Sequence, residues 1–157
     1  SEKRNPILLA CLRKGLFFSY VQKNKHLYES FVEVNNDPIL LDQLEDYIMT
    51  HDEDLNIKLE GENAYLETKE TLMNLDSNDI SISGALELLD SYFEEKAITQ
   101  FDRESDDIKN WVLMEFAKQF DGEKGRMKIS QKIDEDITKA IEILDDPFTY
   151  RDVFLHY

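Results

Sequence analysis

The stretch from His51 to Asn56 comes closer than any other to a binding site for a metal ion. Asp52 and Asp54 stand at alternate positions, as the first ligands of a calcium-binding loop do. A loop beginning at Asp52 would need glycine at its sixth position and glutamate at its twelfth, where this chain has Ile57 and Asn63. The pattern therefore predicts a solvated acidic loop and no calcium site.

The histidines, the single cysteine and the glycines suggest no other reactive centre. His26, His51 and His156 are scattered, and the only helical pairing, His26 with Glu29, is more typical of an ordinary surface. Cys11 lies in an apolar run, which predicts a buried thiol, and a lone cysteine excludes an internal disulfide. None of the five glycines forms a phosphate-binding loop. We therefore predict no metal, no cofactor and no catalytic residue, and thus no enzyme.

Charge is the strongest signal, and it is concentrated in the middle of the chain. Residues 26–107 hold 23 acidic and four basic residues, a net charge of −19, whereas residues 1–25 carry +5 and residues 108–157 carry −2. A block of this sign repels phosphates, which argues against nucleic acid and an anionic membrane surface as partners. It favours a basic protein.

The composition indicates one domain, mainly α. A chain of 157 residues that is 41% hydrophobic can bury a core. Each of its three prolines follows Asn or Asp, a combination that is typical of helix starts, at Pro6, Pro38 and Pro147. Apolar spacing predicts a single-domain bundle of about six to seven helices over residues 1–157. The clearest of these helices cover residues 6–22, 26–34, 38–50, 83–99, 105–122 and 129–144.

Residues 51–75 allow two interpretations. Leu55, Ile57 and Leu59 alternate with polar residues, which would fit a small β-hairpin within 54–69. The richness in Ala, Glu, Leu and Met favours a helix from Asn63 to Leu75 instead, and we prefer the helix. After residue 144 an aromatic tail follows, which we expect to be docked. The most apolar run, residues 6–21, contains Arg13 and Lys14 and is too short and too charged to span a membrane.

We expect the acidic surface to be the binding site. Core packing is the simpler role for Tyr47 and Tyr92, which together with Tyr65 are candidate aromatic anchors for a partner. The predicted partner-binding residues cluster in one loop and around the junction of two predicted helices: Asp52, Glu53, Asp54, Glu94, Glu95, Asp102, Glu104, Asp106 and Asp107.

An acidic helical protein of this kind suits the role of an immunity protein or antitoxin. Nuclease active sites attract phosphate and are therefore basic, so an acidic plug associates with them quickly. We predict a cytoplasmic inhibitor that covers the basic active site of a nuclease-type toxin. Two alternatives are a DNA-mimic inhibitor and a helical adaptor or assembly module of a larger complex, which would expose an apolar patch. The oligomeric state is not predicted.

Overall fold

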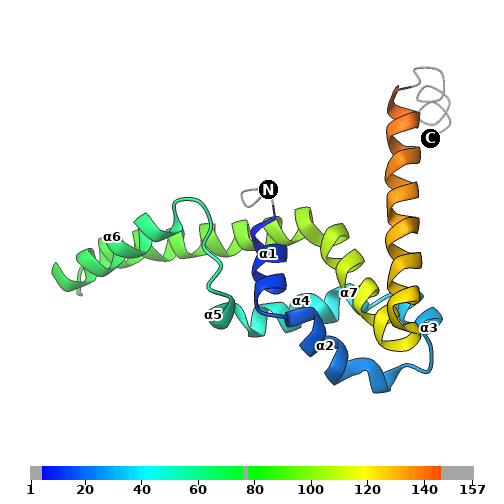
Figure 1. The fold of residues 1–157 in the computed structure, drawn as a ribbon. Helices are drawn as coiled ribbons and strands as arrows, with labels where there is room; N and C mark the ends of the chain where they lie inside the picture. The colour runs from blue at the N-terminus through cyan, green and yellow to red at the C-terminus, as the bar shows by residue number, and fades with distance from the viewer. Residues whose placement is uncertain (1–4, 76–77, 146–157) are drawn as a thin grey trace. The chain divides into compact units, whose positions relative to one another are not determined.

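The chain folds into helices joined by short connections (Figure 1). The structure is a computed structural model that describes residues 5–75 and 78–145. Within these residues there are seven α-helices, one 3-10 helix and no strand, which confirms the predicted mainly α bundle. The elements are α1 (Pro6–Arg13), α2 (Leu16–Asn24), η1 (Lys25–Leu27), α3 (Phe31–Asn35), α4 (Leu40–Thr50), α5 (Asp52–Leu55), α6 (Glu62–Leu75) and α7 (Ile80–Asp145).

The described residues form two compact units. The first unit contains residues 5–16 and 39–108, and the second contains residues 17–38 and 109–145. Helix α7 supplies residues to both. The buried side chains of the first unit include Ile7, Leu8, Cys11, Leu40, Leu44, Ile48, Leu55, Leu86, Phe101 and Ile108. Those of the second unit are Phe17, Tyr20, Val21, Val34, Val112, Leu113, Phe116 and Ala117.

The second unit is built around Phe116 of α7. The rings of Tyr20 and Tyr28 meet the Phe116 ring edge-on, at centroid distances of 6.3 Å and 5.6 Å. Nearby, the Lys25 ammonium donates a hydrogen bond of 2.9 Å to the backbone oxygen of Gln119. Edge-to-face aromatic pairs of this kind add specific geometry to apolar burial, so they fix α2 and η1 against α7.

The predicted helix over residues 6–22 is broken in two. Gly15 has a φ of +63°, a left-handed conformation that ends α1 and that side chains other than glycine rarely adopt. Arg13 and Lys14, just before the break, are exposed. The helix predicted over residues 26–34 is also interrupted, because Tyr28 is extended between η1 and α3. Helix α4 begins at Leu40, two residues after Pro38.

Residues 51–75 form two helices joined by a loop and contain no strand, so the β-hairpin alternative is wrong. Helix α5 ends at Asn56, whose φ of 49° is left-handed, and a loop leads to α6 at Glu62. The Glu62 carboxylate accepts a hydrogen bond of 2.8 Å from the backbone N–H of Leu59, which fixes the entry to α6. The preferred helix from Asn63 to Leu75 is therefore confirmed, one residue longer at its start.

Helix α7 replaces three predicted helices. No break separates residues 99 and 105, and the Ser105 hydroxyl donates to the backbone oxygen of Asp102 within the helix rather than capping a new one. A kink does occur at Gly122, where φ is 70° and ψ is −163°, and this is where glycine was expected to end a helix. The predicted helix start at Pro147 and the aromatic tail lie outside the described residues.

Candidate partner-binding surface

Eight of the nine predicted partner-binding residues lie exposed in the first unit. Asp52, Glu53 and Asp54 form the first three residues of α5. The other five lie on α7: Glu94, Glu95, Asp102, Asp106 and Asp107. Of these, Asp107 accepts a hydrogen bond of 3.0 Å from the Asn5 amide, so one of its carboxylate oxygens already has a hydrogen-bond partner within the fold.

Helix α4 adds acidic residues that the prediction left out. Burial raises the pKa of the Glu45 carboxyl above its ordinary value, and the negative charge of Asp102 raises it further, followed by the charges of Asp42 and Asp46. Glu45 of α4 thus lies close enough to Asp102 of α7 to be affected by its charge. Helical spacing placed the acidic residues of α4 on one polar face, but only the packing of α4 near α7 joins them to the acidic surface.

The ninth residue, Glu104, lies inside the fold and is fully buried. Its carboxylate accepts hydrogen bonds from the backbone N–H groups of Ile7 (3.2 Å) and Leu8 (2.7 Å), and from the Gln100 amide (2.8 Å). The first N–H groups of a helix have no partner within the helix and carry partial positive charge. Glu104 therefore caps α1, whereas the Asn5 side chain, the expected cap, makes no capping hydrogen bond.

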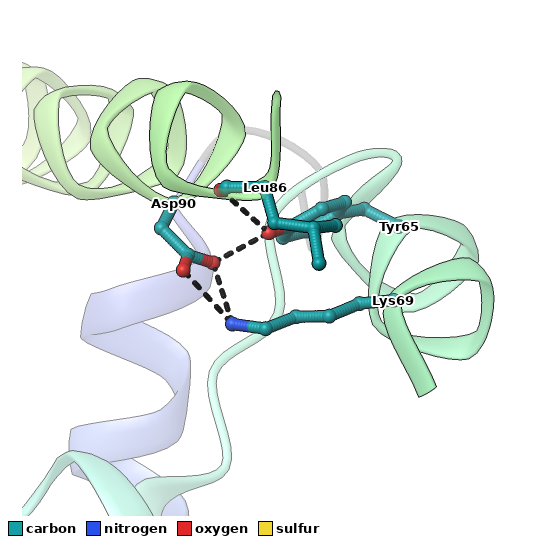
Figure 2. Close-up of polar contacts among 4 residues, drawn as sticks. All are labelled: Tyr65, Lys69, Leu86 and Asp90. Carbon is teal, nitrogen blue, oxygen red and sulfur yellow. Dashed lines mark hydrogen bonds and ion pairs between the residues drawn. The ribbon is translucent and has the colours of Figure 1, made fainter. Parts of the chain in front are cut away.

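A cluster of polar residues joins helix α6 to the first part of α7 (Figure 2). The Tyr65 hydroxyl donates to Asp90 Oδ1 at 2.5 Å and lies 3.1 Å from the backbone oxygen of Leu86. The Lys69 ammonium lies 2.9 Å from both carboxylate oxygens of Asp90. The Tyr65 ring also stacks on Phe93 at 5.2 Å. We call residues 62–75 and 78–93 the hairpin, and these contacts its latch.

The latch makes the hairpin sensitive to alkaline pH. Burial and the hydrogen bond to Asp90 raise the pKa of Tyr65 from its ordinary value of 10 to about 12. Because the folded-state pKa is raised, this contribution to stability is fully present below pH 10 and is lost as the pH rises through about 12. We expect the difference in phenolate absorbance between the wild type and Tyr65→Phe to titrate near pH 12. A difference titrating near pH 10, the ordinary value, would contradict this contact.

Asp90 is the acidic partner of the latch, and its pKa moves the other way. Hydrogen bonds from Lys69, and then from Tyr65, lower the pKa of the Asp90 carboxyl. The stability that this lowering provides is present above the ordinary pKa of an aspartate and is lost as the pH falls through the lowered value. At neutral pH, Tyr65 is therefore protonated and Asp90 is ionised, so all contacts of the latch are present.

The hairpin carries many of the exposed apolar side chains of the described residues. Fifteen large hydrophobic side chains are exposed among the described residues, and seven of them lie between residues 66 and 92. Leu88 is 76% exposed and Ile80 is 88% exposed. Tyr92 is 53% exposed, so core packing, the role favoured for it, is wrong. The seven are Leu66, Met73, Leu75, Ile80, Leu88, Leu89 and Tyr92.

Cys11 is fully buried, as predicted. Burial, and next the charge of Glu104, raise the pKa of its thiol to about 12, which keeps the sulfur protonated and a poor nucleophile.

Within residues 5–75 and 78–145, no three His, Cys, Asp or Glu side chains are grouped so as to hold a metal ion. Over the same residues, no helix combines the length and the apolar character needed to cross a bilayer.

Comparison with known proteins changes the functional interpretation. The family model described as "Probable PDZ-protease, C-terminal helical domain" matches residues 7–144. Searches of curated proteins and of solved structures gave no match. The interpretation as an immunity protein, antitoxin or toxin inhibitor is therefore wrong, because the matching family is a helical domain of a probable PDZ-protease. Only the charge had indicated an inhibitor. With the match covering most of the described helices, this chain belongs to the family of C-terminal helical domains of probable PDZ-proteases.

Proposed function

We propose that this chain is an assembly module of a PDZ-protease. In this proposal the hairpin packs its exposed apolar side chains onto another folded part of the same protease. The observation that carries the proposal is the concentration of exposed apolar residues on the hairpin. Large apolar patches on a soluble protein usually mark an interaction site.

The latch supports this role by giving the hairpin one shape before it binds. No side chain of α6 is fully buried, so apolar packing alone holds the helix weakly against α7. The ion pair of Lys69 with Asp90, and the hydrogen bond from Tyr65, supply directional contacts instead. A surface that is ordered in advance loses less conformational entropy on binding.

Membership in the family favours a partner within the same polypeptide. By its description, the family is the C-terminal helical domain of a probable PDZ-protease. Covalent linkage raises the effective concentration of the two surfaces, so a modest apolar patch is enough for docking. Catalysis would then belong to the protease part, and the helical domain itself would not be an enzyme.

Other expectations from the sequence stay predictions. The exposed acidic residues of α5 and α7 still favour a basic surface over nucleic acid or an anionic membrane. The cytoplasmic location likewise stays a prediction. A basic face of the protease part would satisfy the charge argument without a toxin.

The proposal predicts that polar substitutions on the hairpin weaken docking. Leu66→Gln, Leu88→Gln and Leu89→Gln combined should lower the affinity of this chain for the remainder of the protease on the order of a hundredfold, because apolar burial is lost. Glutamine keeps the helix propensity close to that of leucine. Titration calorimetry at about 0.05 and 0.5 M salt measures the effect, and apolar docking should change little between the two.

A matched control removes charge from the same hairpin. Glu67→Gln, Glu70→Gln and Glu87→Gln alter three exposed residues there and should leave the affinity within about threefold. Equal loss in both triple variants, or none in the leucine variant, would refute docking through the apolar side chains. Binding that disappears at the higher salt would instead point to the acidic surface.

A further inference from the structure

Three of the four basic residues in the acidic middle of the chain line one groove. Residues 26–107 contain Lys58, Lys69, Lys96 and Arg103 as their only basic residues. Lys69 pairs with Asp90 in the latch. The other three meet in a hollow of about 520 Å³ in the first unit. We call this hollow the basic groove; it is lined by Pro6, Lys58, Leu59, Glu60, Asn63, Lys96, Gln100 and Arg103.

Three separate segments form the groove. Helix α7 supplies Lys96, Gln100 and Arg103, whose spacing of four and three residues puts them on one helix face. The loop between α5 and α6 supplies Lys58, Leu59 and Glu60, the start of α6 supplies Asn63, and α1 supplies Pro6. The cations are 38 and seven residues apart in the chain, so only the fold brings Lys58 to the other two.

The cations of the groove are not neutralised by neighbouring carboxylates. The Lys96 ammonium lies 3.4 Å from the backbone oxygen of Glu60 and 5.6 Å from the centre of the Tyr92 ring. Within the described part of the chain, Lys58 and Arg103 have no ion-pair partner, although acidic residues are abundant. Glu60 is the one carboxylate among the lining residues, so the lining carries a net positive charge.

Two adjoining hollows extend the groove. Lys96, Gln100 and Arg103 also line a hollow of about 250 Å³ with Tyr92, Glu95 and Thr99. Pro6 and Lys58 line another hollow of about 250 Å³ that reaches Arg13 of α1. Together the three hollows offer amide, apolar and cationic side chains with two carboxylates, Glu60 and Glu95, and this spread of groups suits an extended peptide better than a single compact ion.

We propose that the basic groove binds an acidic segment of a polypeptide through its Asp or Glu side chains. Arginine and lysine side chains pair with carboxylates by charge-assisted hydrogen bonds. Free chain ends are usually held by a nest of backbone N–H groups. Here the first N–H groups of α1, beside Pro6, donate to Glu104 and are not available for such a nest.

The acidic residues around the groove argue against large anionic ligands. Nucleic acids and anionic membranes carry negative charge over wide areas, and the exposed acidic residues of α4, α5 and α7 would repel them. A short acidic segment needs only the groove. At physiological salt, charges more than about 8 Å away are largely screened. This inference is independent of docking through the hairpin.

The test measures fluorescence anisotropy of a labelled peptide with the whole chain at physiological salt. The probe is a short peptide of alternating acidic and small residues, with both ends blocked. Lys58→Gln, Lys96→Gln and Arg103→Gln combined should weaken its binding by at least about tenfold. The control variant, Lys124→Gln with Lys128→Gln and Lys132→Gln, removes equal charge from exposed residues of the second unit and should change the affinity by less than about twofold.

Two further peptides identify the group that is bound. Replacing each Asp and Glu of the probe by Asn and Gln should abolish binding, and a neutral peptide with a free C-terminal carboxylate should bind no better than this amide version. Equal weakening by both triple variants, or equal binding of the acidic and amide peptides, would overturn the proposal. If the neutral peptide with a free C-terminal carboxylate bound more tightly than the amide version, the groove would bind chain ends, and recognition of Asp and Glu side chains would be wrong. Far-UV circular dichroism of each variant verifies that the helices are intact.

Discussion

Replacing Glu104 by alanine should lower the free energy of unfolding by about 3 kcal/mol, because it removes a buried acceptor from two backbone donors. The N–H groups of Ile7 and Leu8 would stay buried without partners, and the first turn of α1 would lose the negative charge beside it. Alanine favours the helical conformation, so a loss of helix propensity in α7 cannot explain the change. Urea unfolding, followed by circular dichroism, measures it.

Asp106→Ala is the matched control for Glu104. Asp106 lies on the same helix two residues away and is exposed, so this variant should differ from wild type by no more than about 0.5 kcal/mol. Glu104→Gln keeps one oxygen acceptor and should fall between the two. If Glu104→Ala and Asp106→Ala unfold at the same urea concentration, the capping role of Glu104 is wrong.

Alanine at Gly125 should lower the free energy of unfolding by about 2 kcal/mol, because the added methyl group overpacks a tight contact. A Cβ atom there would lie 2.6 Å from the backbone oxygen of Ala117 and 2.7 Å from Cβ of Asp121. The kink at Gly122 produces this close approach of α7 to its own earlier turns. Backbone must therefore move to admit the methyl group.

Alanine at Gly84 should have the opposite effect on the free energy of unfolding. It also lies in α7, but a Cβ atom there would meet nothing within 4 Å. Gly84→Ala should therefore raise the free energy of unfolding by up to about 1 kcal/mol, through helix propensity alone. Thermal melts of the two variants compare them directly, and a rise in both would contradict the packing at Gly125.

Local patterns in the sequence predicted most of the helices but not their continuity. The break at Gly15 was missed because the apolar residues on both sides of Arg13, Lys14 and Gly15 were read as one helix. The continuation of α7 through residues 100–104 was missed because that polar segment resembles a loop. There Gln100 hydrogen-bonds to Glu104, and Glu104 binds the start of α1, 96 and 97 residues away in the chain. Long-range partners of this kind leave no local signal.

The same reason limits what the sequence reveals about sites. Exposure of acidic residues on α5 and α7 follows from composition, whereas burial of Glu104 depends on α1. The basic groove was missed because Lys58 is 38 residues away from Lys96 and only folding joins them. The partner was misjudged for a different reason: negative charge indicates the sign of a complementary surface, and an inhibitor is only one class of protein with such a surface.

Hydrogen–deuterium exchange of the hairpin tests the central claim most directly. It compares the amides of α6 and of the first turns of α7 in this chain alone and in the complete protease. Because no side chain of α6 is fully buried, its amides should exchange faster in the isolated chain than in the complete protease. Docking through Leu66, Leu88 and Leu89 predicts that exchange over residues 62–93 slows in the complete protease. Identical exchange in the two would contradict an assembly role for the hairpin.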